Sequence, residues 1–216
     1  MTEMAKVMTA VRLVGHGGPE MLEVHDDVPV PEPADGEVLI RVRACGMNNT
    51  DINTRVGWYS KEVTDPTSPE GFGQAGENGT WGDKGLTFPR IQGADVCGHV
   101  VAVGDDVNPS RIGERVIVRN MLRSYVDYRP YECWTIGSEC DGGFAQFCVA
   151  PARETHEVDC DWSDAELAAI PCAYSTAENM LYRVGLGAER VLITGASGGV
   201  GSAAVQLAKR RGAYVI

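Results

Sequence analysis

Residues 191–216 are VLITGASGGVGSAAVQLAKRRGAYVI. The apolar run VLIT predicts a short strand, and the glycine turn after it leads into a segment whose apolar positions recur with the 3.6-residue period of a helix. The basic residues at 209–211 suit the C-terminal end of that helix, and Gly212 is well placed to end it. Because 214–216 then starts another strand, this stretch predicts one strand–turn–helix–strand unit.

The glycine turn matches the template G-x-G-x-x-G from position 196 to 201, with alanine at the first glycine position. The second glycine lets the backbone approach a pyrophosphate, and the third lets the helix lie close to the strand. Free N–H groups at the helix start then face the phosphates. A plain tight turn is the alternative, but the flanking strand and helix favour a dinucleotide. The predicted cofactor-binding residues are Ala196, Ser197, Gly198, Gly199, Val200 and Gly201.

The 160 residues at the N-terminal end carry short apolar runs separated by turn signals, a pattern typical of a β-barrel or sandwich. After residue 160 the pattern becomes helical: Ser163 and Glu166 have capping-box spacing, and a second helix is predicted over 175–184. We therefore expect one domain at 1–160 and a second part at 161–216. The predicted strands are 7–14, 21–28, 37–44, 96–103, 115–119 and 144–150.

One segment of the first domain differs from the rest. Residues 60–89 are rich in Gly, Pro, Ser and Thr, and so long a loop without regular structure is usually functional or disordered. Its aromatic residues Phe72, Trp81 and Phe88 suggest a cover for a substrate cleft. A surface insertion without that role is the alternative.

Composition limits the partners. The formal net charge of −11 argues against nucleic acid. No stretch approaches 18 apolar residues and no signal-peptide layout is visible, so we expect a cytoplasmic protein without a membrane partner. The seven cysteines form no C-x-x-C pair, which favours reduced thiols over disulfides or a zinc knuckle.

A glycine turn behind a β-rich domain resembles the medium-chain dehydrogenase/reductase superfamily. The motifs MTAVRLVGHGGPEMLEV, FPRIQGADVCGHVVAVGDDV, IGERVIV, GGFAQFCVAP and AAIPCAYSTAENML follow in that superfamily's order. The resemblance implies an α/β fold class overall, with a GroES-like β-rich catalytic domain followed by the beginning of a Rossmann dinucleotide-binding domain. It also implies that the chain is the N-terminal part of a longer enzyme.

Zinc alcohol dehydrogenases of this superfamily hold a catalytic metal on two cysteines and a histidine. At the corresponding positions this chain has Asn48, Ala94 and Cys172, so only one thiolate is retained. A catalytic zinc needs about three protein ligands, and we predict none here. The stretch from Gly46 to Asp51, followed by Arg55, instead resembles the zinc-free quinone oxidoreductase branch. That branch often has a tyrosine two residues after the Asp, where this chain has Asn53.

This branch uses NADPH to reduce quinones, enones or related carbonyls, which implies a small-molecule substrate. The predicted catalytic residues are Asn48, as a hydrogen-bond donor to the growing negative charge, and Asp51 with Arg55, as a pair shaping the cleft. Asp51 as a helix N-terminal carboxylate and Asn48 as a loop-fixing residue are the alternatives. Thr176 would touch the nicotinamide by resemblance.

The resemblance to this branch implies NADP as the cofactor. NAD is not excluded, because the position that discriminates between them falls about twenty residues past the turn, beyond residue 216. We expect a homo-oligomer, as is usual in this superfamily. Two other hypotheses stay open: a zinc-dependent alcohol dehydrogenase, and a truncated, non-catalytic GroES-like protein used for binding or assembly.

Overall fold

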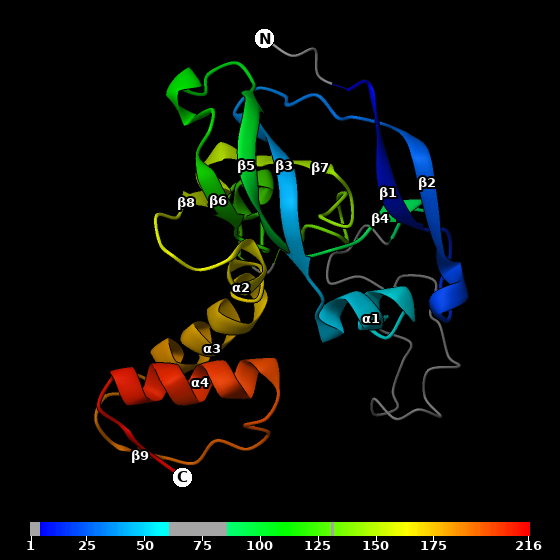
Figure 1. Ribbon diagram of the computed structural model, residues 1–216. Helices are drawn as coiled ribbons and strands as arrows, with labels where there is room; N and C mark the ends of the chain where they lie inside the picture. Colours follow the sequence, from blue (N-terminus) through cyan, green and yellow to red (C-terminus); the bar gives the residue numbers. More distant parts are fainter. Residues whose placement is uncertain (1–4, 61–85, 131) are drawn as a thin grey trace. The chain divides into compact units, whose positions relative to one another are not determined.

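The computed structural model describes residues 5–60, 86–130 and 132–216 (Figure 1). The predicted contributions of Phe72 and Trp81 to a cleft lie outside the described residues. The chain divides into two compact units, Met1–Ala168 and Ala169–Ile216. The boundary predicted after residue 160 precedes the short helix α2 (Asp164–Leu167), whereas the observed division follows it.

The first unit is built on a five-stranded antiparallel sheet in the order β7-β3-β5-β6-β8. In β3, successive residues are fully buried on opposite faces of the sheet. Val38 and Ile40 join one hydrophobic cluster, and Leu39 joins another, as the two-residue period of a strand requires. The strands are β3 (Glu37–Gly46), β5 (Asp95–Val103), β6 (Arg115–Val118), β7 (Phe147–Pro151) and β8 (Thr155–Glu157).

A second, three-stranded sheet in the order β2-β1-β4 is also antiparallel. It consists of β1 (Val7–Leu13), β2 (Leu22–Pro29) and β4 (Arg90–Ile91). Met8 and Ile91 from this sheet share one buried cluster with Leu39 and Phe147 of the larger sheet, so the two sheets enclose a common core. The β-rich unit predicted from the turn signals is confirmed.

Short helices connect the strands. Helix α1 (Asn49–Arg55) follows directly from the end of β3 (Figure 1). The predicted capping box of α2 is present, because Ser163 Oγ accepts the Glu166 N–H and the Glu166 carboxylate accepts the Ser163 N–H. The 3₁₀ helices are η1 (Pro19–Met21), η3 (Pro109–Arg111), η4 (Arg123–Val126) and η5 (Ala152–Glu154).

The second unit contains two packed helices and a pair of parallel strands. The predicted strand–turn–helix–strand order is confirmed by β9 (Arg190–Val191), α4 (Gly199–Arg210) and β10 (Tyr214–Val215). The helix predicted from residue 175 begins earlier, as α3 (Pro171–Arg183), because proline at the first helical position has a backbone angle suited to a helix. Among the described residues, no helix combines the length and apolarity needed to cross a membrane.

Candidate functional site

The junction between β3 and α1 places Asn48 beside two acidic side chains. Asn48 is half-buried and lies at the N-terminal cap of α1. Its backbone N–H donates to Asp51 Oδ2 at 2.8 Å, and its side-chain Nδ2 donates to Asp95 Oδ2. Asp95, the first residue of β5, is fully buried. The asparagine is therefore held at both its backbone and its carboxamide.

Asp51 ties this junction to the segment that precedes β5. Its side chain is buried and accepts the Gly93 N–H at 3.2 Å, while the Gln92 side chain donates to the Asp51 backbone carbonyl at 2.9 Å. Burial raises the pKa of Asp51, and the N–H groups of Asn48 and Gly93 oppose that rise. Asp51 thus lies in the first turn of α1. This is the position of the alternative stated above, in which Asp51 is a helix N-terminal carboxylate.

The backbone beside Asp51 and Asp95 is tightly packed. Gly93 has φ of +101°, and a Cβ there would lie 2.7 Å from both Cys45 Sγ and the Phe144 backbone nitrogen. Burial, followed by the charge of Asp51, raises the pKa of the Cys45 thiol. A neutral thiol is a poor nucleophile, so Cys45 serves here as a packed side chain.

Arg55 and Asp51 have separate partners. The Arg55 guanidinium donates to the Gly17 carbonyl at 2.6 Å, and the Gly17 N–H donates back to the Arg55 carbonyl at 3.1 Å. Among the described residues, Arg55 forms no ion pair with Asp51. It lines a pocket of about 260 Å³ together with Gly17, Gly18, Pro19, Ile52 and Val56. The predicted Asp51–Arg55 pair is therefore not observed: Asp51 accepts the backbone N–H groups of residues 48 and 93, whereas Arg55 donates to the carbonyl of residue 17.

The neighbouring aromatic residues are placed by α1 and the turn after it. Asn53 Nδ2 lies 3.4 Å from the Tyr59 hydroxyl, and the rings of Trp58 and Tyr59 meet edge to face at 5.6 Å. Asn53, which stands where the related branch often has tyrosine, therefore contacts a tyrosine supplied from six residues further along the chain.

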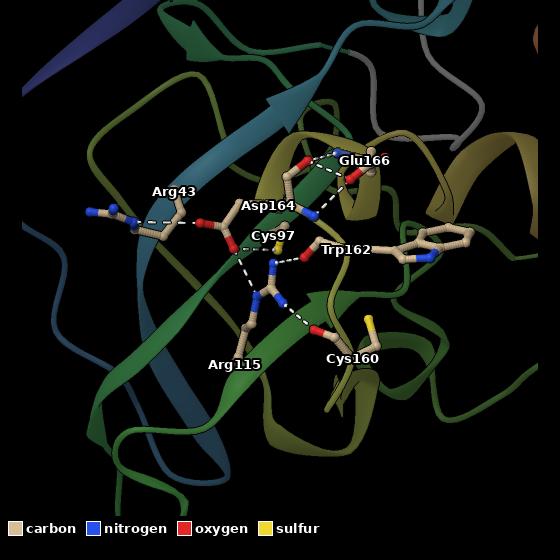
Figure 2. Close-up of polar contacts among 8 residues, drawn as sticks. Arg43, Cys97, Arg115, Cys160, Trp162, Asp164 and Glu166 are labelled. Atoms are coloured by element: carbon tan, nitrogen blue, oxygen red, sulfur yellow. Dashed lines mark hydrogen bonds and ion pairs between the residues drawn. The ribbon is translucent and has the colours of Figure 1, made fainter.

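Behind the junction, Arg115 anchors the segment that leads into α2 (Figure 2). Its guanidinium donates to the carbonyl of Trp162 at 2.6 Å, the carbonyl of Cys160 at 3.1 Å and Asp164 Oδ1 at 2.8 Å. Since Arg115 lies on β6, these three bonds attach residues 160–164 to the central sheet.

Asp164 gathers further groups at the start of α2 (Figure 2). Arg43 Nε lies 3.7 Å from its second oxygen, and the buried thiol of Cys97 donates to the first at 3.8 Å. Burial alone would raise the pKa of Asp164, but the hydrogen bond and charge of Arg115 lower it. At the other end of α2, a Cβ on Gly46 would lie 2.2 Å from the Ala168 carbonyl oxygen. The C-terminal end of α2 therefore packs against the end of β3, two residues before Asn48.

The glycine turn of the second unit has its own steric demands. Gly195 has φ of +66°, and a Cβ on Gly201 would lie 2.2 Å from the Gly195 carbonyl oxygen. Helix α4 begins after Gly198, and its first helical hydrogen bond runs from the Ser202 N–H to the Gly198 carbonyl at 2.8 Å. Residues 194–199 are exposed and Val200 and Gly201 are half-buried, and the backbone N–H groups of such a helix start are suited to bind a phosphate. Ala196, Ser197 and Gly199 belong to the same exposed turn.

Two other predicted residues lie on α3. Thr176 is exposed on this helix, and Cys172 lies half-buried near its start. Among the described residues, no group of three or more metal-binding side chains comes together. Of the positions that correspond to zinc ligands, Ala94 has no donor atom and the amide nitrogen of Asn48 is hydrogen-bonded to Asp95. This donor set does not fit a catalytic zinc.

Comparison with known proteins identifies the first unit. Residues 34–159 match the alcohol dehydrogenase GroES-like domain. The chain belongs to this family. It is a quinone oxidoreductase-like member of the medium-chain dehydrogenase/reductase superfamily, and the predicted fold class is confirmed.

Three similar proteins illustrate the relationship. Human quinone oxidoreductase is 32% identical over 213 residues, which are 98% of this chain and 52% of that protein. A solved structure from Sinorhizobium meliloti 1021, provisionally named an alcohol dehydrogenase, is 50% identical with a TM-score of 0.85, covering 100% of this chain and 58% of its own. A cobalt- and zinc-bound alcohol dehydrogenase from Pyrobaculum aerophilum is 28% identical with a TM-score of 0.74, covering 97% and 58%. The chain spans about half the length of the curated relatives it matches.

Sequence reasoning missed Asp95, although it considered the adjacent Ala94. Asn48 and Asp95 are 47 positions apart, and neither residue belongs to a spacing that predicts a bond between them. The only available signal was an aspartate at the start of a strong apolar strand, where burial of a carboxylate requires a hydrogen-bond donor.

Proposed function

We propose that this chain forms part of an NAD(P)H-dependent oxidoreductase that transfers hydride to a quinone, an enone or another carbonyl substrate without zinc. The observation that carries the proposal is the bond from Asn48 to Asp95, at a position where zinc enzymes of the superfamily place a metal ligand. The similarity to quinone oxidoreductases supports the substrate class. A cytoplasmic, homo-oligomeric protein with a small-molecule substrate belongs to the same proposal.

The cofactor would be held by the turn from Ala196 to Gly201, with Thr176 touching its nicotinamide. When bound, the nicotinamide supplies the hydride. Backbone N–H groups at the start of α4 would bind the pyrophosphate. The space around Gly198 is open, because a Cβ there would meet only the Gly195 carbonyl oxygen at 3.4 Å, and this would let the pyrophosphate approach the backbone. NADP is proposed over NAD on the basis of the quinone oxidoreductase branch.

The protein's chemical contribution is a hydrogen-bond donor for the substrate oxygen. Negative charge grows on that oxygen as hydride arrives, and a fixed donor stabilises it more than it stabilises the neutral carbonyl. One N–H of Asn48 is bonded to Asp95, and in this proposal the second would donate to the substrate oxygen. Asp51 and Arg55 would shape the site by fixing α1 to residue 93 and to residue 17.

Steady-state reduction of 1,4-benzoquinone by NADPH, catalysed by the whole enzyme of which this chain forms part, tests this assignment. Asn48→Ala should lower kcat by about 10²–10³-fold, the usual loss for one such donor, while the KM for NADPH stays unchanged. Asn108→Ala, at an exposed asparagine in the loop before η3, is the matched control and should behave as wild type. A kcat for Asn48→Ala equal to that of the control would remove Asn48 from the chemistry.

A zinc-dependent alcohol dehydrogenase is the second candidate, favoured by the similarity to the metal-bound Pyrobaculum enzyme. It requires about one zinc per chain in the purified protein. Metal analysis decides between the two, because the proposed mechanism requires none. A third hypothesis, a non-catalytic GroES-like binding protein, is supported only if neither NADPH nor NADH binds.

A further inference from the structure

We propose that Asp95 is a positioning residue that fixes the orientation of the Asn48 carboxamide toward the substrate. The inference rests on the proposed function, since it gives the donor role of Asn48 a structural cause. It starts from one contact: Asn48 Nδ2 donates to Asp95 Oδ2 across the ends of β3 and β5.

The chemistry of the two groups fixes the orientation. An ionised carboxylate can only accept hydrogen bonds, whereas a carboxamide has a donating end and an accepting end. In the observed contact Nδ2 faces an accepting oxygen of Asp95, and the alternative orientation would place the Asn48 carbonyl oxygen against that oxygen. One N–H is used in this bond, and the other keeps a fixed direction.

The surroundings make this orientation rigid. Asp95 is fully buried and starts a strand whose register pairs it with Gly46. The Asn48 backbone N–H is bonded to the buried Asp51, so the main chain cannot turn freely when the side chain is released. Fixing both ends reduces the reorganisation needed during the reaction, which is the advantage of a prearranged donor.

Charge and orientation act in opposite directions in this arrangement. A carboxylate beyond the donor repels negative charge on the substrate oxygen, so removing its charge alone would raise kcat. Removing its control of orientation would lower kcat, since small misplacements cost up to about 10²-fold. The substitution Asp95→Asn does both, because asparagine keeps the shape but can face either end of the Asn48 amide, whose orientation would then depend on its capping contact with the Asp51 N–H. A decrease in kcat therefore reports lost orientation.

The test compares four variants of the whole enzyme in NADPH-dependent reduction of 1,4-benzoquinone. Asp95→Asn should lower kcat at least tenfold without changing the KM for NADPH. The exchange variant, Asn48→Asp with Asp95→Asn, restores the hydrogen bond in reverse but presents a carboxylate oxygen to the substrate, so it should be as stable as wild type and remain inactive. Glu154→Gln removes another buried carboxylate, 1% exposed, and should keep full kcat. Asn48→Ala separates the two proposals.

Each outcome has one meaning. If Asn48→Ala is inactive while Asp95→Asn keeps or exceeds wild-type kcat, the positioning inference is overturned and the proposed function stands. If Asn48→Ala is fully active, the donor role fails and with it the basis for the inference. If the exchange variant has full activity, the Asn48–Asp95 bond has only a structural role, and the positioning inference is overturned.

A measurement on the unsubstituted protein covers the case in which Asp95→Asn does not fold. The side-chain amide protons of Asn48, followed by NMR, should exchange with solvent more slowly than those of the exposed Asn108, and the proton donated to Asp95 should be shifted downfield. Exchange as fast as that of Asn108, with no such shift, would overturn the fixed orientation.

Discussion

Replacement of Asp51 by alanine should destabilise the first unit by an amount that the contacts define. The Asp51 carboxylate accepts two backbone N–H groups, from Asn48 at 2.8 Å and Gly93 at 3.2 Å, and the residue is only 6% exposed. Leaving a buried donor unsatisfied costs about 1–3 kcal/mol, so the two together amount to about 2–6 kcal/mol. Burial already disfavours the charged carboxylate, as its raised pKa indicates, which offsets part of this loss. We expect a net decrease of about 2–4 kcal/mol in the free energy of unfolding.

Urea denaturation followed by tryptophan fluorescence measures this decrease. All four tryptophans, at positions 58, 81, 134 and 162, belong to the Met1–Ala168 unit, so the signal reports its unfolding. Asp51→Asn keeps one acceptor oxygen and should cost about half as much, while Asp105→Ala, at an exposed aspartate, should stay within about 0.5 kcal/mol of wild type. If the free energy of unfolding of Asp51→Ala equals that of Asp105→Ala, the Asp51 carboxylate does not stabilise the junction.

Three further predictions concern the turn, the pH dependence and the anchor of α2. Gly201→Val should abolish NADPH binding in a fluorescence titration, because its Cβ would lie 2.2 Å from the Gly195 carbonyl oxygen; Gly187→Ala is the control, and unchanged affinity would argue against the turn as the site. Burial raises the folded-state pKa of Asp51 above its ordinary 3.8, so its contribution to stability is full below that value and is lost as pH rises through the folded-state pKa. Wild type should therefore lose stability relative to Asp51→Asn as pH rises from 3.8, and a pH-independent difference in urea unfolding would be inconsistent with this. Arg115→Met should speed amide hydrogen exchange at 160–166 with β3 and β5 still protected, whereas exchange equal to that of Arg153→Met would show that Arg115 is no anchor.

The sequence predicted the parts of the fold that depend on local patterns. Alternating apolar residues located β1, β3 and β5, and the Ser163–Glu166 spacing located the start of α2. The glycine turn and the helix after it were visible because the steric demand at Gly201 arises within a few residues. Local periodicity and capping are encoded over short distances, so they can be found without a structure.

The site was less predictable because its contacts join distant parts of the chain. Asn48 meets Asp95, and Arg55 meets Gly17, with no periodic relation between them. Arg115 binds two backbone carbonyls, which have no side-chain signature in a sequence. The expected Asp51–Arg55 pair followed from the resemblance to the quinone oxidoreductase branch, but the buried carboxylate accepts backbone N–H groups instead.

The most direct test of hydride transfer without zinc is the turnover of 1,4-benzoquinone with NADPH by the whole enzyme of which this chain forms part, before and after metal is removed by a chelator. The proposed mechanism predicts measurable turnover with the same kcat in both preparations, because a hydrogen bond from Asn48, and not zinc, stabilises the negative charge on the substrate oxygen. Loss of activity on chelation and its recovery with one equivalent of zinc would contradict the account, as would the absence of turnover in both preparations.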